Sequence, residues 1–148
     1  MNLDLLIWHL QLSEGYKNKP YLCPAKKLTI GYGRNLQDNG ISKDEADLML
    51  KNDVLNVKLE LEDRLSFFGD LDDVRQNVLV EMGYNMGVPN LLKFKKTLQF
   101  IKEQDYESAS EEMLNSKWHR DFIEYAPNTH ISALRSSRLS KILREGAY

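Results

Sequence analysis

The sequence predicts an α+β fold in which a small β portion precedes a larger helical portion. Three observations support this class. Residues 16–33 are rich in turn formers and end in the alternating run 28–33, which is typical of a strand. From Ser42 onward, apolar residues recur at helical spacing through most of the chain. No internal repeat or low-complexity tract interrupts this order, so the 148 residues are expected to form a single domain.

Composition indicates a folded protein that does not span a membrane. Hydrophobic residues make up 42% and charged residues 28% of the chain, which argues against disorder. No apolar run reaches the roughly 20 residues that a spanning helix needs. The N-terminal stretch contains Asp4 and lacks a basic start, so it reads as neither a signal peptide nor an anchor. A single cysteine, Cys23, excludes an internal disulfide and favours synthesis in a reducing compartment.

Charge is unevenly distributed along the chain, whose net charge is −2. Residues 117–148 carry six basic and three acidic side chains, whereas the middle of the chain is acidic. The basic excess suits an anionic partner, although a solvated helix face of this charge is the commoner case.

The first elements follow from apolar spacing and turn chemistry. Residues 1–12 are expected to form a short helix that ends before Gly15. Glu14 would then lie just past its end. The strand over 28–33 is expected to belong to a small antiparallel hairpin or meander. A turn at 39–40, Asn-Gly, should end this β region.

A long helix is expected from Ser42 to about residue 63. Ser42 and Glu45 form a capping box, in which each side chain satisfies an amide of the helix start. Asp53 falls inside the apolar stripe of this helix, where a buried carboxylate needs a partner. Arg34 is the expected partner.

The rest of the chain should contain further helices, giving six or so in all. The acidic run at 70–73 favours a helix N-terminus, and glycines at 83 and 87 favour its end. Later helices are expected over about 91–101, over 106–114 and after the capping sequence at 127–129, with Ser-Lys-Trp at 116–118 between helices.

Three residues of the β portion show a characteristic spacing. Eight residues separate Glu14 from Cys23, and five separate Cys23 from Thr29. Together with Thr-Ile-Gly-Tyr-Gly at 29–33, this resembles the catalytic signature of phage-type lysozymes, the muramidase endolysins of glycoside hydrolase family 24. In that family the pattern is Glu, eight residues, Asp or less often Cys, five residues, then Thr. Further matches run to the last residues, so the resemblance covers nearly the whole chain.

The resemblance implies a lysozyme-like fold. Its parts would be a small β lobe (about 14–41), a connecting helix (about 42–63) and a helical lobe (about 64–148) with which the N-terminal helix (1–12) packs. The substrate cleft would lie between the lobes. Only seven residues separate Gly33 from Ile41, fewer than is usual in the family, so a minimal β lobe is expected.

The residue types suit cleavage of a glycosidic bond. That reaction needs an acid for the leaving oxygen and a group that activates water or captures the oxocarbenium-like centre. Glu14 fits the acid if burial beside apolar side chains raises its pKa. Thr29 has a hydroxyl that can position a water molecule. Cys23 stands where Asp is commoner; Lys26 and Lys27 could lower its pKa, and the thiolate would then act either as a base or as a nucleophile.

The resemblance also carries the cleft positions of the family over to this chain. They fall on Asn35, Tyr84 and Thr97, which would contact the substrate. Asn35 stands where an aliphatic residue is common in the family.

Other chemistries fit less well. The histidines, His9, His119 and His130, are scattered without metal-ligand spacing, so neither a metal nor another cofactor is expected. The chain has no phosphate-binding loop and no dinucleotide fingerprint. A papain-like thiol enzyme would need His119 or His130 beside Cys23, and the sequence leaves that arrangement open.

The expected function is that of an endolysin that hydrolyses the β-1,4 bond between N-acetylmuramic acid and N-acetylglucosamine in bacterial peptidoglycan. The resemblance implies a monomer that stays in the host cytoplasm until a separate holin releases it, and that then acts on the cell wall from the periplasm. Neither nucleic acid binding nor stable membrane insertion is expected. Two alternatives remain open: a lytic transglycosylase, and a catalytically inactive wall-binding protein of the same fold.

Overall fold

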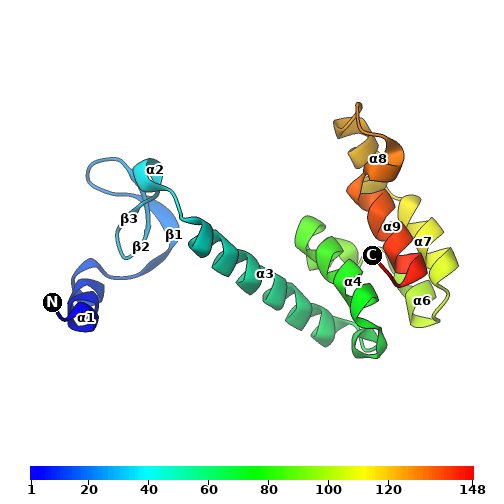
Figure 1. Cartoon of the computed structure of the whole chain (residues 1–148), viewed down its shortest axis with the longest axis horizontal. Coiled ribbons are helices and arrows are strands. Elements are labelled where there is room, and N and C mark those ends of the chain that lie inside the picture. The colour runs from blue at the N-terminus through cyan, green and yellow to red at the C-terminus, as the bar shows by residue number, and fades with distance from the viewer. The chain divides into compact units, whose positions relative to one another are not determined.

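The computed structural model describes residues 1–148, with the side chain of Ser132 left out. The chain is mostly helical, with a small three-stranded antiparallel sheet in its N-terminal part (Figure 1). This arrangement confirms the predicted α+β class. The chain divides into two compact units, Met1–Met49 and Leu50–Tyr148, and the boundary falls within α3 (Lys43–Arg64). The expected packing of the first helix with the helical lobe stays a prediction.

The first unit begins with a helix and a sheet. Its elements are α1 (Leu3–Glu14), β1 (Lys17–Leu22), β2 (Leu28–Gly31), β3 (Arg34–Asn35) and α2 (Leu36–Asn39). The side chain of Asn2 accepts a hydrogen bond from the Leu5 amide at 3.0 Å and so caps α1. Because α1 extends to Glu14, that residue is the last of the helix rather than the first beyond it.

The sheet has β2 as its central strand, in the order β1-β2-β3. Thr29 on β2 pairs with Tyr21 on β1 and with Asn35 on β3, so the predicted meander is confirmed. The single strand expected over 28–33 is in fact β2 followed by the turn that leads into β3. The backbone turns there because Gly31 and Gly33 adopt positive φ angles of 68° and 80°, which an extended strand does not contain.

The β region ends in a short helix instead of the bare turn expected at 39–40. The Asn35 side chain accepts a hydrogen bond from the Asp38 amide at 3.0 Å and thereby starts α2. Gly40, with φ 59°, ends this helix.

The capping box of α3 is confirmed. The Ser42 amide donates to Glu45 Oε2 at 2.7 Å, and the Glu45 amide donates to Ser42 Oγ at 3.2 Å. Arg34 pairs with Glu45 instead of the predicted Asp53, and it also donates to the Gly40 carbonyl at 3.1 Å. Asp53 is exposed, so water solvates its carboxylate and the burial that called for a partner does not arise.

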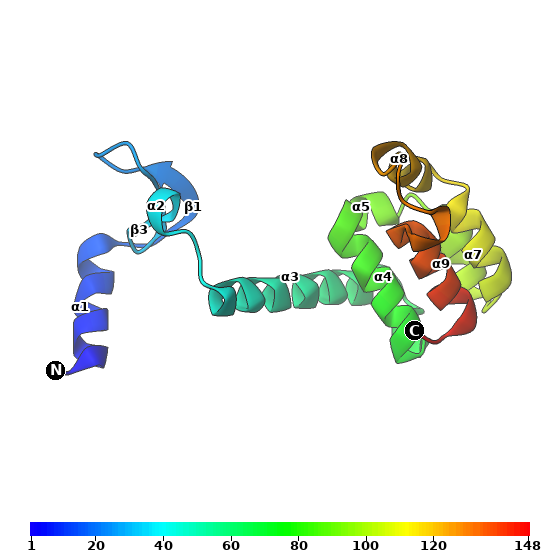
Figure 2. The same cartoon turned by 45° about the horizontal axis from the view of Figure 1, so that its top comes forward.

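The second unit is helical. Its elements after α3 are η1 (Phe68–Asp70), α4 (Asp73–Met86), α5 (Val88–Leu91), α6 (Lys95–Lys102), α7 (Tyr106–Leu114), α8 (Lys117–Tyr125), η2 (Ile131–Ala133) and α9 (Arg135–Glu145). Figure 2 shows α9 between α4 and α7, and it contacts both of them. Among the described residues, no helix is both long and apolar enough to cross a membrane.

One apolar core holds these helices together. Val57 of α3 packs against it, and Leu61 of the same helix is fully buried, as the predicted stripe requires. On α4 the buried side chains include Val78, Leu79 and Met82. Other side chains without exposed surface are Phe68, Leu91, Ile101, Met113 and Leu143.

Arg75 ties the start of α4 to the end of α9. Its guanidinium donates to the carbonyls of Leu143 at 2.8 Å and Arg144 at 2.9 Å. It also pairs with Asp72 at 2.6 Å and lies 3.6 Å from the ring centroid of Tyr106. The last carbonyls of a helix lack partners within the helix, so Arg75 stabilises the C-terminus of α9.

Three helix predictions need correction. Residues 91–101 were expected to form one helix, but α5 ends at Leu91 and α6 begins only at Lys95. The segment 127–129 does not cap the last helix, because η2 intervenes before α9. The residues after Ser116 form α8, which was not predicted although Ser116 is its N-cap and accepts from the His119 amide at 3.2 Å.

Candidate active site

Glu14 ends α1 beside the turn between β2 and β3. Its Oε2 lies 3.1 Å from the position that a Cβ on Gly33 would occupy, so a side chain there would push the carboxylate aside by a few tenths of an ångström. The Glu14 side chain is exposed, whereas the sequence led us to expect burial beside apolar side chains. Its near neighbour in the first unit, Gly33, has no side chain.

Cys23 follows β1 and opens the tight connection to β2. Its amide donates to the Lys27 carbonyl at 3.0 Å, and its carbonyl accepts from the Lys26 amide at 2.7 Å. Lys26 has φ 59°, the left-handed conformation with which hairpin loops of this kind end. The hydrogen bonds of this loop therefore fix the backbone that carries the thiol.

Thr29 is the buried hydroxyl of the sheet. Its side chain is only 3% exposed, and its Oγ1 donates to the Lys27 carbonyl at 2.9 Å. The same hydroxyl helps to lower the pKa of the Cys23 thiol. Because a hydroxyl has one proton, it donates either to the carbonyl or to the ionised sulfur, while its lone pairs remain available to a further donor such as water.

These contacts lower the pKa of the Cys23 thiol. The largest cause is a hydrogen bond from the backbone amide of Lys27; partial burial opposes it, and the Thr29 hydroxyl adds to it. The sequence assigned this effect to the charges of nearby lysines. The Lys27 ammonium instead pairs with Asp38 at 3.1 Å, so the backbone amide is the main cause of the shift.

The predicted cleft residues line three different pockets. Asn35 caps α2 and lines a pocket of the first unit. Tyr84 on α4 is 46% exposed and lines a cavity of about 330 Å³ in the second unit. Thr97 on α6 is 2% exposed and lines another cavity of that unit, of about 350 Å³. The structure thus brings Cys23 and Thr29 together, but Tyr84 and Thr97 do not share a pocket.

The cavity at Tyr84 contains polar contacts that sequence reasoning missed. Arg135 Nε lies 3.4 Å from Glu81 Oε1. The Tyr148 hydroxyl accepts a hydrogen bond from Asn77 Nδ2 at 3.0 Å. These partners come from helices and a terminus far apart in the chain, and no local pattern links them.

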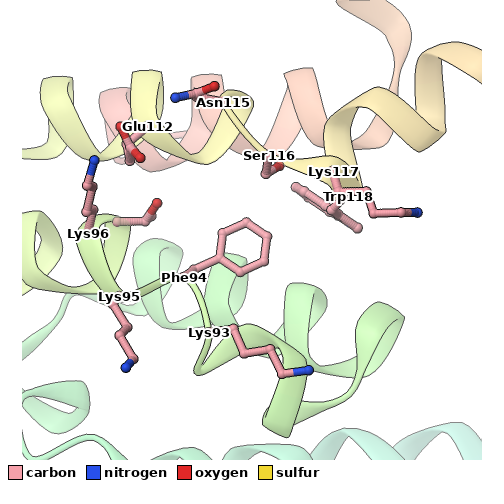
Figure 3. Close-up of a pocket in the computed structure, with 10 residues that line it drawn as sticks. Lys93, Phe94, Lys95, Lys96, Glu112, Asn115, Ser116, Lys117 and Trp118 are labelled. Atoms are coloured by element: carbon pink, nitrogen blue, oxygen red, sulfur yellow. The ribbon is translucent and has the colours of Figure 1, made fainter.

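The cavity at Thr97 lies between α6 and the junction of α7 with α8 (Figure 3). Phe94 and Trp118 meet edge to face in it, with ring centroids 6.2 Å apart. Trp118 Nε1 donates to Asn85 Oδ1 at 2.8 Å, which orients the indole. Trp118 belongs to the Ser-Lys-Trp sequence at 116–118, which was expected to lie between helices and lies where α8 follows α7.

Metal ligands do not gather in the described part of the chain. No group of three or more His, Cys, Asp or Glu side chains there is arranged to hold an ion.

Comparison with known proteins identifies the family. The family model of phage lysozymes matches residues 11–140. This range contains the candidate catalytic and substrate-binding residues. The chain belongs to the phage lysozyme family. Its fold is accordingly the lysozyme-like α+β fold, with a small sheet and a larger helical part.

Two relatives come from Dictyostelium discoideum. Probable T4-type lysozyme 1 is 30% identical over 109 residues, which cover 72% of this chain and 58% of that protein. Probable T4-type lysozyme 2 is 34% identical over 140 aligned positions, and the alignment covers 74% of this chain and 82% of that protein. The chain therefore spans less than two thirds of the first relative.

Proposed function

We propose that this protein is a muramidase that hydrolyses the β-1,4 bond between N-acetylmuramic acid and N-acetylglucosamine in peptidoglycan. Family membership supports the substrate class. The observation that carries the proposal is the placement of Cys23, whose pKa is lowered, on the hydrogen-bonded loop that leads into the strand of the buried Thr29. The Glu14 carboxylate lies over the turn that follows the strand of Thr29.

Each residue has a role that its chemistry allows. Glu14 protonates the leaving oxygen, and its exposure leaves it open to a sugar chain. Thr29 holds a water molecule through a lone pair of its hydroxyl, and the Cys23 thiolate takes a proton from that water as it attacks the anomeric carbon. The attack comes from the face opposite Glu14, so the product has inverted configuration. The reaction needs no cofactor in this scheme.

Direct attack by sulfur is the second possibility. It would form a covalent thioglycoside and, after hydrolysis, would retain the configuration. We favour inversion because Thr29 is suited to holding water and because a thioglycoside is slow to hydrolyse. NMR of the first product formed from a defined oligosaccharide distinguishes the two routes. An α-anomer is expected, and a β-anomer appearing first would reject the base mechanism.

The biological role that we propose is host cell lysis at phage release. The protein would act as a monomer, stay in the host cytoplasm until a holin opens the membrane, and then reach the wall in the periplasm. The catalytic signature resembles that of phage endolysins, and this resemblance supports the role. The named relatives are from Dictyostelium, so the role at phage release is separate from the activity itself.

Clearing of purified peptidoglycan is the first test, followed by mass spectrometry of the soluble products. A muramidase releases fragments with reducing N-acetylmuramic acid ends, and Glu14→Gln should release none. A 1,6-anhydro sugar would instead identify a lytic transglycosylase. Binding to the wall without any soluble product would identify an inactive wall-binding protein.

A further inference from the structure

We propose that the aromatic pair of Tyr16 and Tyr32 positions the Glu14 carboxylate for the proposed reaction. The two tyrosines lie beside the contact between Glu14 and Gly33, one on each of the two segments that meet there. They are positioning residues, because they act on the leaving oxygen only through Glu14. Their role in catalysis rests on the proposed function, whereas their effect on the place of the carboxylate does not.

The first observation is the register between β1 and β2. Lys17 pairs with Gly31 across the antiparallel sheet. One residue further toward the turn come Tyr16 and Tyr32, so this register places their side chains opposite each other. Their ring centroids are 5.5 Å apart at an interplanar angle of 44°, which is within the range of a favourable aromatic contact. The rings therefore extend the pairing of the two segments beyond the Lys17–Gly31 pair.

The second observation is the position of Glu14 relative to this pair. Only Gly15 separates Glu14 from Tyr16, and Tyr32 directly precedes Gly33. The Glu14 Oε2 lies 3.1 Å from the position of a Cβ on Gly33. The ring contact and the carboxylate contact thus join the same two segments, at most two residues apart. A displacement of either tyrosine would therefore move the carboxylate relative to the turn.

The third observation is that the link between α1 and the sheet is intrinsically flexible. Gly15 ends α1 with a φ of 69°, and a glycine at this place restricts the backbone less than any other residue. Within the first unit, α1 buries none of its side chains, so core packing does not fix the end of the helix there. The contact between the two rings follows directly after this glycine. It therefore limits the orientations that the end of α1 can adopt.

A sugar-binding platform is the alternative reading of this pair. Tyr16 is 66% and Tyr32 47% exposed, and exposed aromatic faces can stack on a sugar ring. A platform of two residues needs rings that lie nearly in one plane. The rings of this pair are inclined at 44° and contact each other, so they present no common flat face. The geometry favours positioning, and the experiment below distinguishes the two roles.

The chemical shift of the Gly33 amide reports the place of the carboxylate without requiring hydrolysis. In NMR spectra of the full-length chain, this shift should change as the Glu14 carboxyl titrates between about pH 7 and 3. Glu14→Gln should abolish the change and so assign it to Glu14. Tyr16→Ala and Tyr32→Ala should each reduce its amplitude by about half or more, because the carboxylate then moves away from Gly33. Tyr16→Phe and Tyr32→Phe keep the rings and should keep the amplitude.

Kinetics on a defined peptidoglycan oligosaccharide test the consequence for catalysis. Each alanine variant should lower kcat by about tenfold and leave KM within about twofold, because the acid is misplaced while the sugar still binds. The phenylalanine variants should stay within about twofold of the wild type. The double alanine variant should lose about as much as either single one, since both remove the same contact. Tyr125→Ala removes an exposed tyrosine of α8 in the second unit and is the matched control.

Three results would overturn the proposal. One is an unchanged Gly33 titration in folded alanine variants. Another is a rise in KM with unchanged kcat, which would identify a sugar platform. The third needs no variant and decides the matter if the alanine variants do not fold: it is the absence of a nuclear Overhauser effect between the two rings in the wild type.

The proposed function and this inference fail in different ways. A wild-type chain that leaves peptidoglycan intact, but whose Gly33 titration depends on the tyrosines, would refute the proposed function and keep the positioning of the carboxylate. A chain that clears peptidoglycan, but whose alanine variants retain both kcat and the Gly33 titration, would refute only the role of the tyrosines.

Discussion

The two units of the chain hold their residues in place by different means. Among the side chains that the structure describes, every buried apolar one belongs to Leu61 or a later residue. The first unit buries only Thr29 among its described side chains. Its order comes from caps, from the hydrogen-bonded loop at Cys23 and from glycines with positive φ. Residues with candidate catalytic roles are thus positioned by local hydrogen bonds, and the helical unit is stabilised by apolar packing.

The difference predicts that changes in the first unit alter activity more than stability. Glu14→Gln should have the largest effect on activity, a loss of about a thousandfold, because the amide cannot protonate the leaving oxygen. The thermal unfolding midpoint should stay unchanged or rise, since the side chain is exposed. Clearing of peptidoglycan measures the activity, and Glu60→Gln on α3 is the matched control. A loss of less than about tenfold would remove Glu14 as the acid.

Truncation of a core residue in the second unit should show the opposite pattern. Leu79 is fully buried, so Leu79→Ala should lower the free energy of unfolding by about 2–5 kcal/mol. Leu22 in β1 is 66% exposed, and Leu22→Ala should cost less than about 1 kcal/mol. Urea denaturation compares the two variants. Equal losses would contradict the contrast between the units.

The close approach of Glu14 to the β2–β3 turn allows a test with two glycines. Gly33 and Gly40 both have positive φ, at 80° and 59°, so an alanine at either position strains the backbone by about 1–2 kcal/mol. A Cβ at Gly33 would press on the Glu14 carboxylate, whereas a Cβ at Gly40 would have no atom within 4 Å. Gly33→Ala should therefore lose about tenfold more activity than Gly40→Ala at similar stability. Equal activity in the two variants would show that this contact does not position the acid.

The pKa of the Cys23 thiol should change when a hydrogen bond to it is removed. Thr29→Val removes one donor, so the pKa of Cys23 should rise and the pH midpoint of its alkylation should move upward. Lys27→Gln removes only a side chain that pairs with Asp38 and keeps the backbone amide, so the midpoint should hardly move. A larger shift of the alkylation midpoint in Lys27→Gln than in Thr29→Val would show that the lysine charge lowers the pKa of Cys23, as the sequence suggested. Complete alkylation of Cys23 should also greatly reduce clearing of peptidoglycan, and full activity afterwards would end its catalytic role.

The smallest expected effect is a pH dependence of stability in the second unit. His119 on α8 is 8% exposed, its Nδ1 lies 2.7 Å from Ser136 Oγ on α9, and burial lowers its pKa. The unfolded chain, with a histidine pKa of about 6.5, then binds more protons than the folded one. This contribution to stability is fully present above about pH 6.5 and is lost as the pH falls below it. Urea denaturation between pH 8 and 5 should show the loss in the wild type and less of it in His119→Gln. The exposed His9→Gln is the control, and identical pH profiles of all three proteins would refute the assignment.

Much of the local structure could be read from the sequence, because its signals act over a few residues. The capping box at Ser42 and the acidic start of α4 were predicted correctly, since a cap and its helix lie within one turn. Two local predictions failed. The strand over 28–33 was cut short by backbone angles at its glycines, and α8 was missed although its N-cap, Ser116, was visible.

The candidate site was predicted in part. The spacing predicted Glu14, Cys23 and Thr29 as site residues, and the family match confirms the resemblance to phage lysozymes. The spacing did not reveal what lowers the pKa of Cys23, because the decisive donor is the amide of Lys27 and its effect depends on how the loop folds back. The roles of the three residues stay predictions until the variants above are measured.

The sequence by itself determined the α+β class, the order of the main elements and the lysozyme signature, all of which depend on composition, periodicity and spacing along the chain. Only the tertiary structure decided which groups that are far apart in the sequence come into contact. It paired Arg34 with Glu45 and tied the last carbonyls of α9 to Arg75. The physical reason is that such contacts depend on packing between elements. A residue's own neighbours in the sequence do not encode which side chain from another helix or strand will lie within 3–4 Å of it.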